Sequence, residues 1–371
     1  MKNVVIFRNQ LFKVSETFIT EQASSLINYK PIFVGRKLYS KTNFDAVSLD
    51  KCSLIENLRF VFFRDVRCLE KELRGERIDL IHCHFGVDSI YAYNLSKKLN
   101  VPLVITLHGI DATIKKWDLL KSMRPAYLNY LFFRSGVFEK CKKIICVSNF
   151  IRGTLKENYE LYNKSTVHYI GTDLNKAPNL IEKKKFSILH VARLTEKKGT
   201  KYLIKAFSEV LDLYSEARLD IIGEGPLENE LIKLVDKLGL TDKVYFHGAM
   251  AKDEVMNYMA SSSIFCVPSV TAKNGDSEGL GMVFLEAALS KSVVVSTDHG
   301  GIPEAVIDGE TGFLVDERNH IQIRDGILKL FSDDELLKVM ADNAFYHVIQ
   351  NFDVCRQSLS LEVIYDEVIS K

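Results

Sequence analysis

The chain has 371 residues and a formal net charge of +1, with 47% hydrophobic and 26% charged residues. This length exceeds the usual size of a single hydrophobic core, so two domains are expected. The small net charge argues against a nucleic-acid partner. The sequence contains no run of about 18 apolar residues, so a membrane-spanning helix is not predicted. Seven cysteines without disulfide-scaffold spacing favour a reducing cytoplasm, and the N-terminal ten residues predict a strand rather than a signal peptide.

Short apolar runs alternate with amphipathic segments along the whole chain. They lie at Val4–Phe7, Pro31–Val34, Ile78–Phe85, Pro102–Leu107, Lys143–Val147, Thr166–Ile170, Ser187–Leu194, Arg218–Ile222, Val244–His247, Ser263–Val267, Ser292–Ser296 and Gly312–Val315. Continuous Val/Ile/Leu runs between helical stretches are typical of parallel strands that are covered on both faces. The sequence therefore predicts an α/β protein with two doubly wound, Rossmann-like domains that face each other across a cleft.

A polar stretch between residues 171 and 185 marks the predicted domain boundary. The first domain is expected at residues 1–175 and the second at residues 176–350. Residues 351–371 have apolar side chains at helical spacing but no strand of their own, so we expect a helix that packs back on the first domain. Ligands in such sheets bind at the carboxyl ends of the strands, where the loops carry most information.

The loop after the first strand contains Ser15, Glu16 and Thr17. Ser15 is a suitable residue to cap a helix, and Glu16 and Thr17 suit its first turn. The alternative is functional, because the same loop could lie over an acceptor substrate.

Histidines follow the third and fourth predicted strands. His82 and His84 share one strand face and could bind a metal, but no acidic or cysteine partner at ligand spacing supports this, so a position lining the cleft is favoured. His108 stands at the next strand tip, ahead of Gly109 and Asp111. We expect His108 to hydrogen-bond a sugar or phosphate, with either protonation state open; satisfying a backbone carbonyl is the structural alternative. We also expect Asp111 to contact the substrate.

Lysines and arginines flank aromatic residues and leucines between Ile114 and Lys143, and a weaker pattern of this kind covers Asn57–Arg74. This pattern is typical of a helix at a membrane interface. It is also typical of a helix that packs on the core and exposes its lysines, which is the commoner case. Peripheral membrane contact is therefore one of two interpretations.

The first strand of the second domain leads into a loop with Arg193 and Lys198. Two cations at this spacing in a strand-to-helix loop can bind both phosphates of a diphosphate. Later strand-tip loops carry the residues Gly223, Gly225, Gly248 and Met250. Gly223 and Gly225 permit close approach of the backbone to a ligand, and Gly248 and Met250 could pack against a nucleobase through backbone groups, although ordinary turns explain both loops equally well. The dinucleotide fingerprint G-x-G-x-x-G is absent.

The segment Phe265–Ala288 is the most informative stretch of the chain. An apolar strand ends near Ser269, and Glu278-Gly279-Leu280-Gly281 then opens an apolar helix that begins Met282-Val283 and contains Glu286. Glycines at a helix start let backbone N–H groups approach an anion, and the flanking glutamates can accept hydrogen bonds from hydroxyls. Backbone N–H donors for a phosphate, flanked by glutamates that accept hydrogen bonds from sugar hydroxyls, predict a nucleotide-sugar site.

The order of these motifs resembles the family-four retaining glycosyltransferases, which have the GT-B architecture of two Rossmann-like domains. The match consists of Glu278 to Glu286, with Val267-Pro268-Ser269 before it and Gly300-Gly301-Ile302-Pro303-Glu304 after it. The segment Val191–Gly199 resembles the family's phosphate-side element. The loop at Ser15 and the segment His82–Gly86 are similar to bacterial exopolysaccharide and colanic-acid-type transferases, but the family's frequent glycine-rich loop after the first strand is missing.

The resemblance implies a role for each of these residues. Arg193 and Lys198 would bind the donor diphosphate together with the backbone of Gly279 to Met282, Glu286 would bind the ribose, Glu278 the sugar hydroxyls, and His108 would lie near the transferred sugar. The implied activity is transfer of a hexose from a UDP-sugar or GDP-sugar to a glycan or lipid-linked oligosaccharide in surface polysaccharide biosynthesis, at the cytoplasmic face of the membrane.

The chain contains no Asp-x-Asp sequence, so the cationic side chains and the helix N-terminus are expected to replace a divalent metal, with no cofactor. The alternatives are a non-catalytic nucleotide-sugar or glycan-binding protein of the same fold, a dinucleotide enzyme such as an epimerase, and a phosphorylase that uses pyridoxal phosphate.

Overall fold

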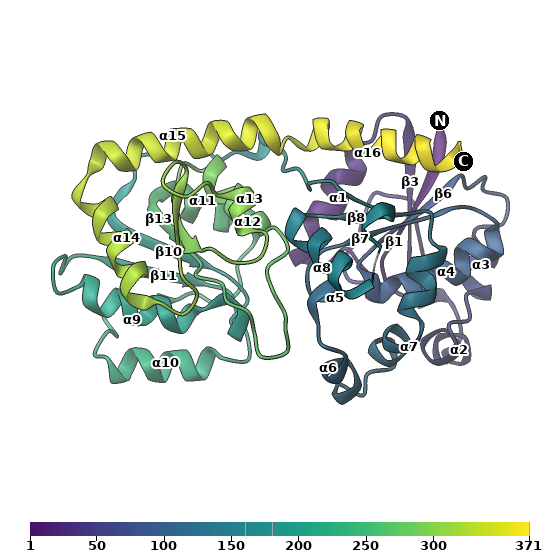
Figure 1. Ribbon diagram of the computed structural model, residues 1–371, viewed down its shortest axis with the longest axis horizontal. Coiled ribbons are helices and arrows are strands. Elements are labelled where there is room, and N and C mark those ends of the chain that lie inside the picture. Colours follow the sequence, from purple (N-terminus) through teal and green to yellow (C-terminus); the bar gives the residue numbers. More distant parts are fainter. Residues whose placement is uncertain (160, 180, 371) are drawn as a thin grey trace. The chain divides into compact units, whose positions relative to one another are not determined.

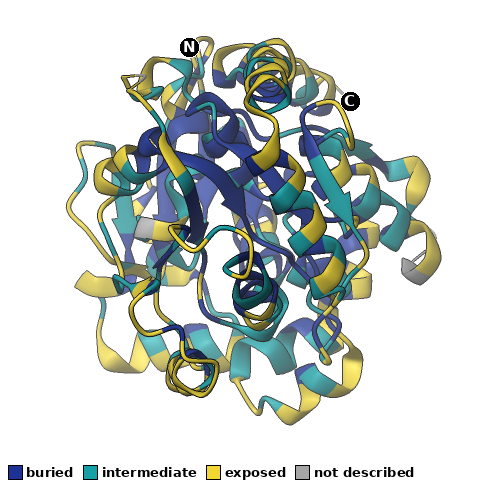
Figure 2. Cartoon of the chain, turned by 90° about the vertical axis from the view of Figure 1, so that its left-hand side faces the viewer, coloured by how far each residue is buried: buried dark blue, intermediate teal, exposed yellow. Residues whose placement is uncertain are grey.

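The computed structural model describes residues 1–159, 161–179 and 181–370 and separates into two compact units. Unit 1 comprises Met1–Gly171 and Val354–Lys371, and unit 2 comprises Thr172–Asp353. In each unit, helices surround a parallel sheet (Figure 1). Figure 2 shows the strands as mostly buried and the outer faces of the helices as exposed. No helix in the described part of the chain is long and apolar enough to cross a membrane.

Unit 1 contains a seven-stranded sheet in the order β5-β3-β1-β6-β7-β8-β9, and every neighbouring pair in it is parallel. Its strands are β1 (Lys2–Phe7), β3 (Tyr29–Gly35), β5 (Ala46–Ser48), β6 (Leu80–His84), β7 (Leu103–Leu107), β8 (Lys143–Cys146) and β9 (Ser165–Val167), and β2 (Gln10–Leu11) pairs with β4 (Lys37–Leu38). Its helices are α1 (Thr17–Ser24), α2 (Leu54–Phe63), α3 (Arg67–Glu72), α4 (Gly86–Leu99), α5 (Ile110–Thr113), α6 (Lys116–Lys121), α7 (Pro125–Lys140), α8 (Asn149–Tyr159) and α16 (Val354–Ile369).

The hydrophobic runs of unit 1 form strands because both faces of the sheet are covered. Val4 and Ile6 on β1 are buried and belong to one core cluster with Leu80 and Val104 on the adjoining strands. Because helices cover both faces of the sheet, the side chains on both faces can be apolar. The strands are therefore continuous apolar runs, without an alternation of apolar and polar residues.

Helix α16 belongs to unit 1 although it follows the whole of unit 2 in sequence. Leu361, Tyr365 and Val368 on α16 join the core cluster of β1 and β6. The Glu362 carboxylate accepts backbone N–H bonds from Ile27 and Asn28 at 2.6 and 2.8 Å. These contacts make the C-terminal helix part of the first domain's core.

Unit 2 contains a six-stranded parallel sheet in the order β12-β11-β10-β13-β14-β15. Its strands are β10 (Lys184–Val191), β11 (Arg218–Ile222), β12 (Val244–Phe246), β13 (Ser262–Cys266), β14 (Val293–Thr297) and β15 (Gly312–Val315). Its helices are α9 (Thr200–Val210), α10 (Glu228–Lys237), α11 (Lys252–Ser261), α12 (Met282–Leu289), α13 (Ile302–Ala305), α14 (His320–Ser332) and α15 (Asp334–Asn351). Strands β10 and β13 are central neighbours, so the loops that follow them open at the same edge of the sheet.

The predicted fold class, two Rossmann-like α/β domains with parallel sheets, is confirmed. The short strands β2, β4 and β5 were not expected, because two or three residues carry too weak a pattern. Cys52 and Cys68 form a disulfide, a pairing that the spacing of the cysteines did not indicate. Cys52 precedes α2 and Cys68 lies on α3, so the pairing depends on how these two helices pack rather than on spacing along the chain.

Candidate functional site

The loop between β10 and α9 carries the two predicted cations, Arg193 and Lys198, together with Lys197. The Arg193 side chain is exposed and makes no hydrogen bond or ion pair with any residue that the structure describes, while the Arg193 carbonyl accepts a hydrogen bond from the Thr195 hydroxyl. The Nζ of Lys198 lies 2.5 Å from Oε2 of Glu278. Gly199 follows with a φ of +65°, and a Cβ there would lie 1.8 Å from the carbonyl oxygen of Pro268. Only glycine therefore allows this loop to pack so closely against the end of β13.

Glu278 is a buried carboxylate held by cations. Burial alone would raise its pKa, but the charges of Lys198 and Lys197 and the hydrogen bond from Lys198 outweigh this and lower the pKa to about 2. Lys197 also pairs with Asp276 at 3.1 Å. Glu278 is therefore an ionised hydrogen-bond acceptor at neutral pH.

His299 and Glu317 form a support that sequence reasoning missed. The backbone N–H of Glu278 donates to Nε2 of His299 at 3.1 Å, and Nδ1 of His299 lies 2.6 Å from Oε1 of Glu317. Because a backbone N–H can only donate, Nε2 must be the unprotonated nitrogen, and Nδ1–H donates to Glu317. Burial lowers the pKa of His299, although Glu317 opposes this, which favours the same neutral tautomer. The available signal was a histidine just after β14, as for His108 after β7.

The start of α12 is open to an anion. Gly281 precedes the helix with a φ of +86°, and no side chain caps the helix. The first N–H groups of α12, from Met282 and Val283, thus have no intrahelical acceptor. Gly279 and Leu280 are buried and have no polar side chain, so only their backbone groups can hydrogen-bond a ligand. The Oγ of Ser269 is fully buried and has no hydrogen-bond partner among the residues that the structure describes.

Glycines hold three strand-tip loops against one another. A Cβ on Gly223, whose φ is +124°, would lie 2.1 Å from the carbonyl oxygen of Ala192, and one on Gly225 would lie 2.3 Å from that of Leu194. The N–H of Gly223 donates to the carbonyl of Gly248 at 2.7 Å. The glycines expected to approach a ligand therefore also lock the loops beside Arg193 in place.

Glu286 lies on helix α12, and Met250 lies just before the neighbouring helix α11. Glu286 is partly exposed on the second turn of α12, and its carboxylate lies 3.3 Å from Nζ of Lys252 at the start of α11. Met250, just before α11, is also partly exposed. Within unit 2, the structure thus gathers the residues predicted to bind phosphate and sugar hydroxyls on the loops at the carboxyl edge of one sheet and on helix α12.

His108 in unit 1 stands at the tip of β7. Its ring lies 5.2 Å from that of Phe18 and 4.3 Å from that of Phe85, centroid to centroid. Its Nε2 lies 3.1 Å from Nδ1 of His84. Burial, and then the nearby His82 and Arg8, lower the pKa of His108 well below its usual value. The imidazole is neutral at pH 7, and one of its two nitrogens already pairs with His84.

Asp111 is fully buried, and its carboxylate accepts N–H bonds from Gly86, His108 and Gly109 at 2.7 to 3.0 Å. Burial raises the pKa of Asp111, and these backbone donors oppose the rise. The observed contacts fix the loop that carries His108. A direct contact of Asp111 with a substrate stays a prediction.

His82 has an internal role. Its Nδ1 lies 2.6 Å from the Tyr365 hydroxyl, and its Nε2 lies 2.6 Å from Oγ1 of Thr106. Both ring nitrogens are therefore occupied by neighbours on α16 and β7, which leaves neither for a metal.

The loop after β1 is ordered by an arginine that sequence reasoning passed over. Arg8 donates two hydrogen bonds to Glu16, at 2.8 and 2.9 Å, and also pairs with Asp88. Ser15 lies exposed in a 3₁₀ turn and caps neither that turn nor α1, which begins at Thr17. The expectation that Ser15 caps the helix is wrong, because the Arg8–Glu16 pair holds the loop instead.

The chain is similar in sequence to known glycosyltransferases. Residues 172–346 match the family model of glycosyl transferases group 1, and residues 42–176 match that of glycosyltransferase family 4. The chain is 33% identical over 272 residues to an uncharacterized glycosyltransferase of Methanocaldococcus jannaschii, covering 73% of this chain and 70% of that protein. It is 31% identical over 297 residues to a putative colanic acid biosynthesis glycosyltransferase of Salmonella typhimurium, covering 76% of this chain and 70% of that protein.

Solved structures share the fold. Sucrose-phosphate synthase from Thermosynechococcus elongatus superposes over 100% of both chains with a TM-score of 0.81 at 16% identity. The Anabaena protein HepE in complex with UDP-glucose covers 99% of this chain and 100% of that one, with a TM-score of 0.79 at 18% identity. Sequence and fold together establish that this chain belongs to glycosyltransferase family 4 and has the GT-B architecture.

Proposed function

We propose that this protein is a retaining hexosyltransferase that uses a nucleoside diphosphate sugar. The acceptor would be a glycan or lipid-linked oligosaccharide of a surface polysaccharide. The observation that carries the proposal is the pairing of Lys198 with the buried Glu278 beside the uncapped start of α12. Cations for a diphosphate and an ionised acceptor for sugar hydroxyls thus lie within one loop cluster.

Each described contact suggests a role in donor binding. The diphosphate would take hydrogen bonds from Arg193, from Lys198 and from the N–H groups at the start of α12. Lys198 would then exchange its carboxylate partner for a phosphate, which would leave Glu278 to accept hydrogen bonds from the sugar. Glu286 would bind the ribose hydroxyls, and the unpartnered Oγ of Ser269 is a further polar group for the ligand. The neutral His108 would hydrogen-bond the transferred sugar.

The chemistry requires stabilisation of the leaving diphosphate while an oxocarbenium-like centre forms. Arg193 and Lys198 place positive charge where the negative charge of the leaving group develops. Retention would follow from attack of the acceptor hydroxyl on the face that the diphosphate leaves, with a phosphate oxygen taking the hydroxyl proton. Glu278 and Glu286 are assigned to binding in this scheme and are not a hydrolase pair.

The relatives support the substrate class. The Salmonella relative is described as a colanic acid biosynthesis glycosyltransferase, and HepE was crystallised with UDP-glucose. These descriptions belong to those proteins; for this chain they favour a nucleotide-sugar donor and a polysaccharide pathway.

A thermal-shift panel of UDP, GDP and ADP with their hexose derivatives tests donor binding. We expect one nucleotide and its sugar derivative to raise the Tm of the protein. In a transfer assay, labelled hexose should move to an acceptor extract at a rate that a chelator does not change. Loss of transfer with chelator would refute metal independence. Nucleotide-sugar binding without hydrolysis or transfer would favour the alternative, a non-catalytic binding protein.

A further inference from the structure

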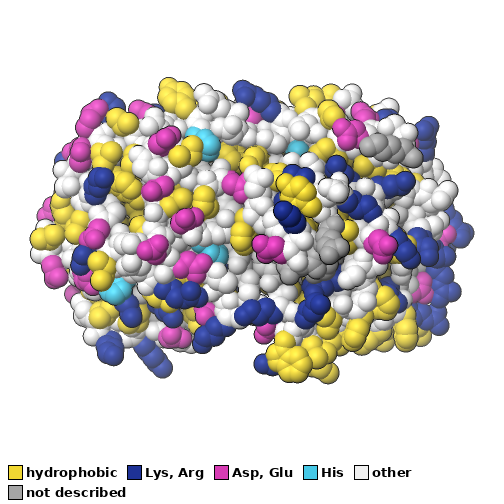
Figure 3. Space-filling view, in the orientation of Figure 1, with side chains coloured by type: hydrophobic (Ala, Val, Ile, Leu, Met, Phe, Trp, Pro, Cys, Tyr) yellow, Lys and Arg dark blue, Asp and Glu magenta, His cyan; other side chains and the backbone are white. Residues whose placement is uncertain are grey.

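Three helices of unit 1 present large apolar side chains to solvent. We define the apolar surface by six residues, each more than half exposed: Ile55, Phe62, Phe63, Trp117, Met123 and Phe132. Helix α7 packs against both α2 and α6, and Asn129 on α7 donates a hydrogen bond to the carbonyl of Val61 on α2 at 3.0 Å. Figure 1 shows the three helices side by side at one edge of unit 1, and Figure 3 shows hydrophobic side chains gathered in that region.

These helices expose more apolar side chains than their packing on the core requires, although α6 buries Leu119 and α7 buries Tyr130, Val137 and Phe138. Helix α2 has the sequence LIENLRFVFF, yet Phe60 is its only fully buried side chain. Helix α7 buries Arg134 and exposes Phe132 to 70%. A surface helix normally turns its apolar stripe to the core. The apolar surface is therefore not required by the packing of unit 1, and exposed patches of this kind mark interaction sites.

Basic residues surround the apolar surface. Residues 115–124 contain four lysines and arginines and a single acidic residue. Lys121 lies 5.7 Å above the ring of Trp117, and Arg64 lies 3.5 Å above that of Phe133. Aromatic residues among cations are the composition that binds at the headgroup level of an anionic bilayer.

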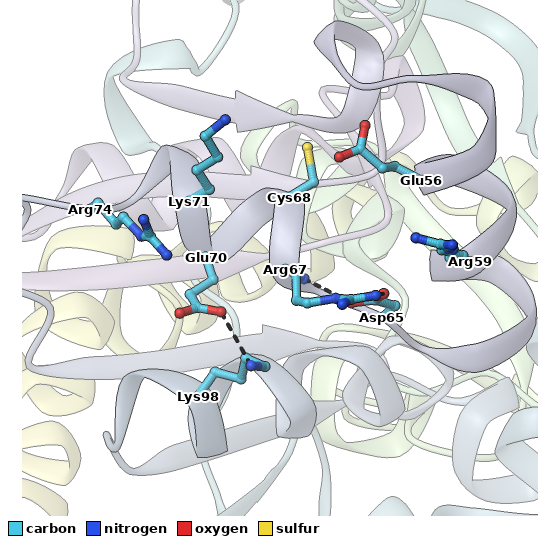
Figure 4. A pocket seen from close by; sticks show the side chains of 9 residues that line it. All are labelled: Glu56, Arg59, Asp65, Arg67, Cys68, Glu70, Lys71, Arg74 and Lys98. Atoms are coloured by element: carbon cyan, nitrogen blue, oxygen red, sulfur yellow. Dashed lines mark hydrogen bonds and ion pairs between the residues drawn. The ribbon is translucent and has the colours of Figure 1, made fainter.

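A basic pocket adjoins the apolar surface on α2. It has a volume of about 450 Å³ and lies between α2, α3 and Lys98 on α4 (Figure 4). Its acidic side chains are already engaged: Asp65 with Arg67, Glu70 with Lys98 and Glu56 with Ser53.

Three cations of this pocket remain available. The side chains of Arg59, Lys71 and Arg74 make no hydrogen bond or ion pair with the residues that the structure describes. Arg59 lies one helical turn from Ile55, so the pocket and the apolar surface share the outer side of α2.

We propose that the apolar surface docks on an anionic lipid bilayer and that the pocket of Arg59, Lys71 and Arg74 receives a lipid phosphate. The exposed aromatic side chains would enter the interface, and the cations would meet the negative headgroups. The charge pattern favours this occupant over a second copy of the chain, because two such surfaces would bring like charges together. The proposal does not depend on the donor sugar or on transfer activity.

Trp117 is the only tryptophan of the chain, so its fluorescence reports directly on this surface. We expect its emission to shift to the blue, with quenching by brominated lipid, on adding vesicles of phosphatidylcholine with phosphatidylglycerol, and a much smaller change with phosphatidylcholine alone. Phe63→Ser with Phe132→Ser should lower vesicle binding at least tenfold without changing Tm. Leu213→Ser with Tyr346→Ser, at exposed apolar positions of unit 2, is the matched control and should bind normally.

The Lys71→Glu with Arg74→Glu variant tests the pocket and should weaken binding to the anionic vesicles several-fold. An unchanged emission with both kinds of vesicle would overturn the proposal. A blue shift without lipid that grows with protein concentration would also overturn it, because a second copy would then cover the surface. Saturable binding of inorganic phosphate alone, abolished by the pocket variant, would assign the pocket to a soluble anion and overturn its role as a lipid site.

Discussion

At the residue scale, Lys198 and Arg193 differ in what surrounds them, although both are assigned to the same diphosphate. Lys198 neutralises a buried carboxylate, whereas the side chain of Arg193 is exposed and has no hydrogen-bond or ion-pair partner among the described residues. Removal of one member of a buried pair leaves an uncompensated charge. The effects of substituting the two residues should therefore be distinguishable when both turnover and the free energy of unfolding are measured.

We predict that Arg193→Ala and Lys198→Ala each lower turnover by roughly two orders of magnitude, since each removes charge that stabilises the leaving group. Only Lys198→Ala should also lower the free energy of unfolding, by about 3 kcal/mol. Steady-state kinetics and urea denaturation measure the two effects. Lys201→Ala, an exposed lysine on α9, is the control; near wild-type rates in both site variants would refute the diphosphate assignment.

The pKa of Glu278 predicts a loss of stability in acid. Its folded pKa of about 2 lies below the ordinary value of 4.5, so its contribution is present above pH 4.5 and is lost as the pH falls towards 2. The full contribution is on the order of 3 kcal/mol. Urea denaturation between pH 7 and pH 3 should show a decline that is shallower in a Lys198→Met, Glu278→Gln double variant, in which both charges are removed. Equal slopes would contradict the assigned pKa.

At the scale of elements, the site depends on loops that approach one another more closely than side chains allow. Gly223 and Gly225 after β11 lie against the backbone of the Arg193 loop, and Gly199 lies against the end of β13. These positions exclude a Cβ for steric reasons, so the glycines are required by packing whatever the ligand.

We predict that Gly223→Ala lowers both stability and nucleotide affinity, because the new Cβ would lie 2.1 Å from a backbone oxygen and the φ of +124° disfavours an L-residue. A cost of about 2 kcal/mol or more in unfolding free energy is expected. Gly136→Ala within α7, where nothing lies within 4 Å of the added Cβ, should instead be neutral or stabilise by up to about 1 kcal/mol. Calorimetric titration and denaturation distinguish the two; a tolerated Gly223→Ala would show that the loops can separate.

At the scale of the whole molecule, the chain leaves unit 1 at Gly171 and returns to it at Val354. Tyr365 on the returning helix is fully buried, with its ring 5.1 Å from that of Tyr29 and its hydroxyl 2.6 Å from His82. Unit 1 is therefore complete only when the last helix has been added.

Tyr365→Ala should destabilise unit 1 by about 3 to 5 kcal/mol through the cavity that it leaves. Tyr365→Phe should cost only about 1 to 2 kcal/mol, the value of a buried hydrogen bond. In the Tyr365→Ala variant, hydrogen exchange resolved by mass spectrometry should be faster in β1 and β6 than in the wild type, while β10 and β13 in unit 2 serve as the internal control. Equal acceleration in unit 2 would contradict the independence of the two cores.

The sequence by itself determined the sheet architecture and the choice of candidate donor-site residues. Continuous apolar runs predict buried parallel strands because only helix-covered strands lack alternation. Since ligands of such sheets bind after strand ends, Arg193, Lys198 and Glu278 could be selected from their positions alone.

Only the tertiary structure decided which side chains meet. The pairs Lys198–Glu278, Arg8–Glu16 and Cys52–Cys68 join loops or helices whose approach depends on the packing of the elements between them. The same holds for His299, which supports Glu278 from a neighbouring strand tip, and for α2, whose apolar face points outward. Local pattern specifies that a helix forms, but the direction in which it faces is set by contacts between residues far apart in sequence.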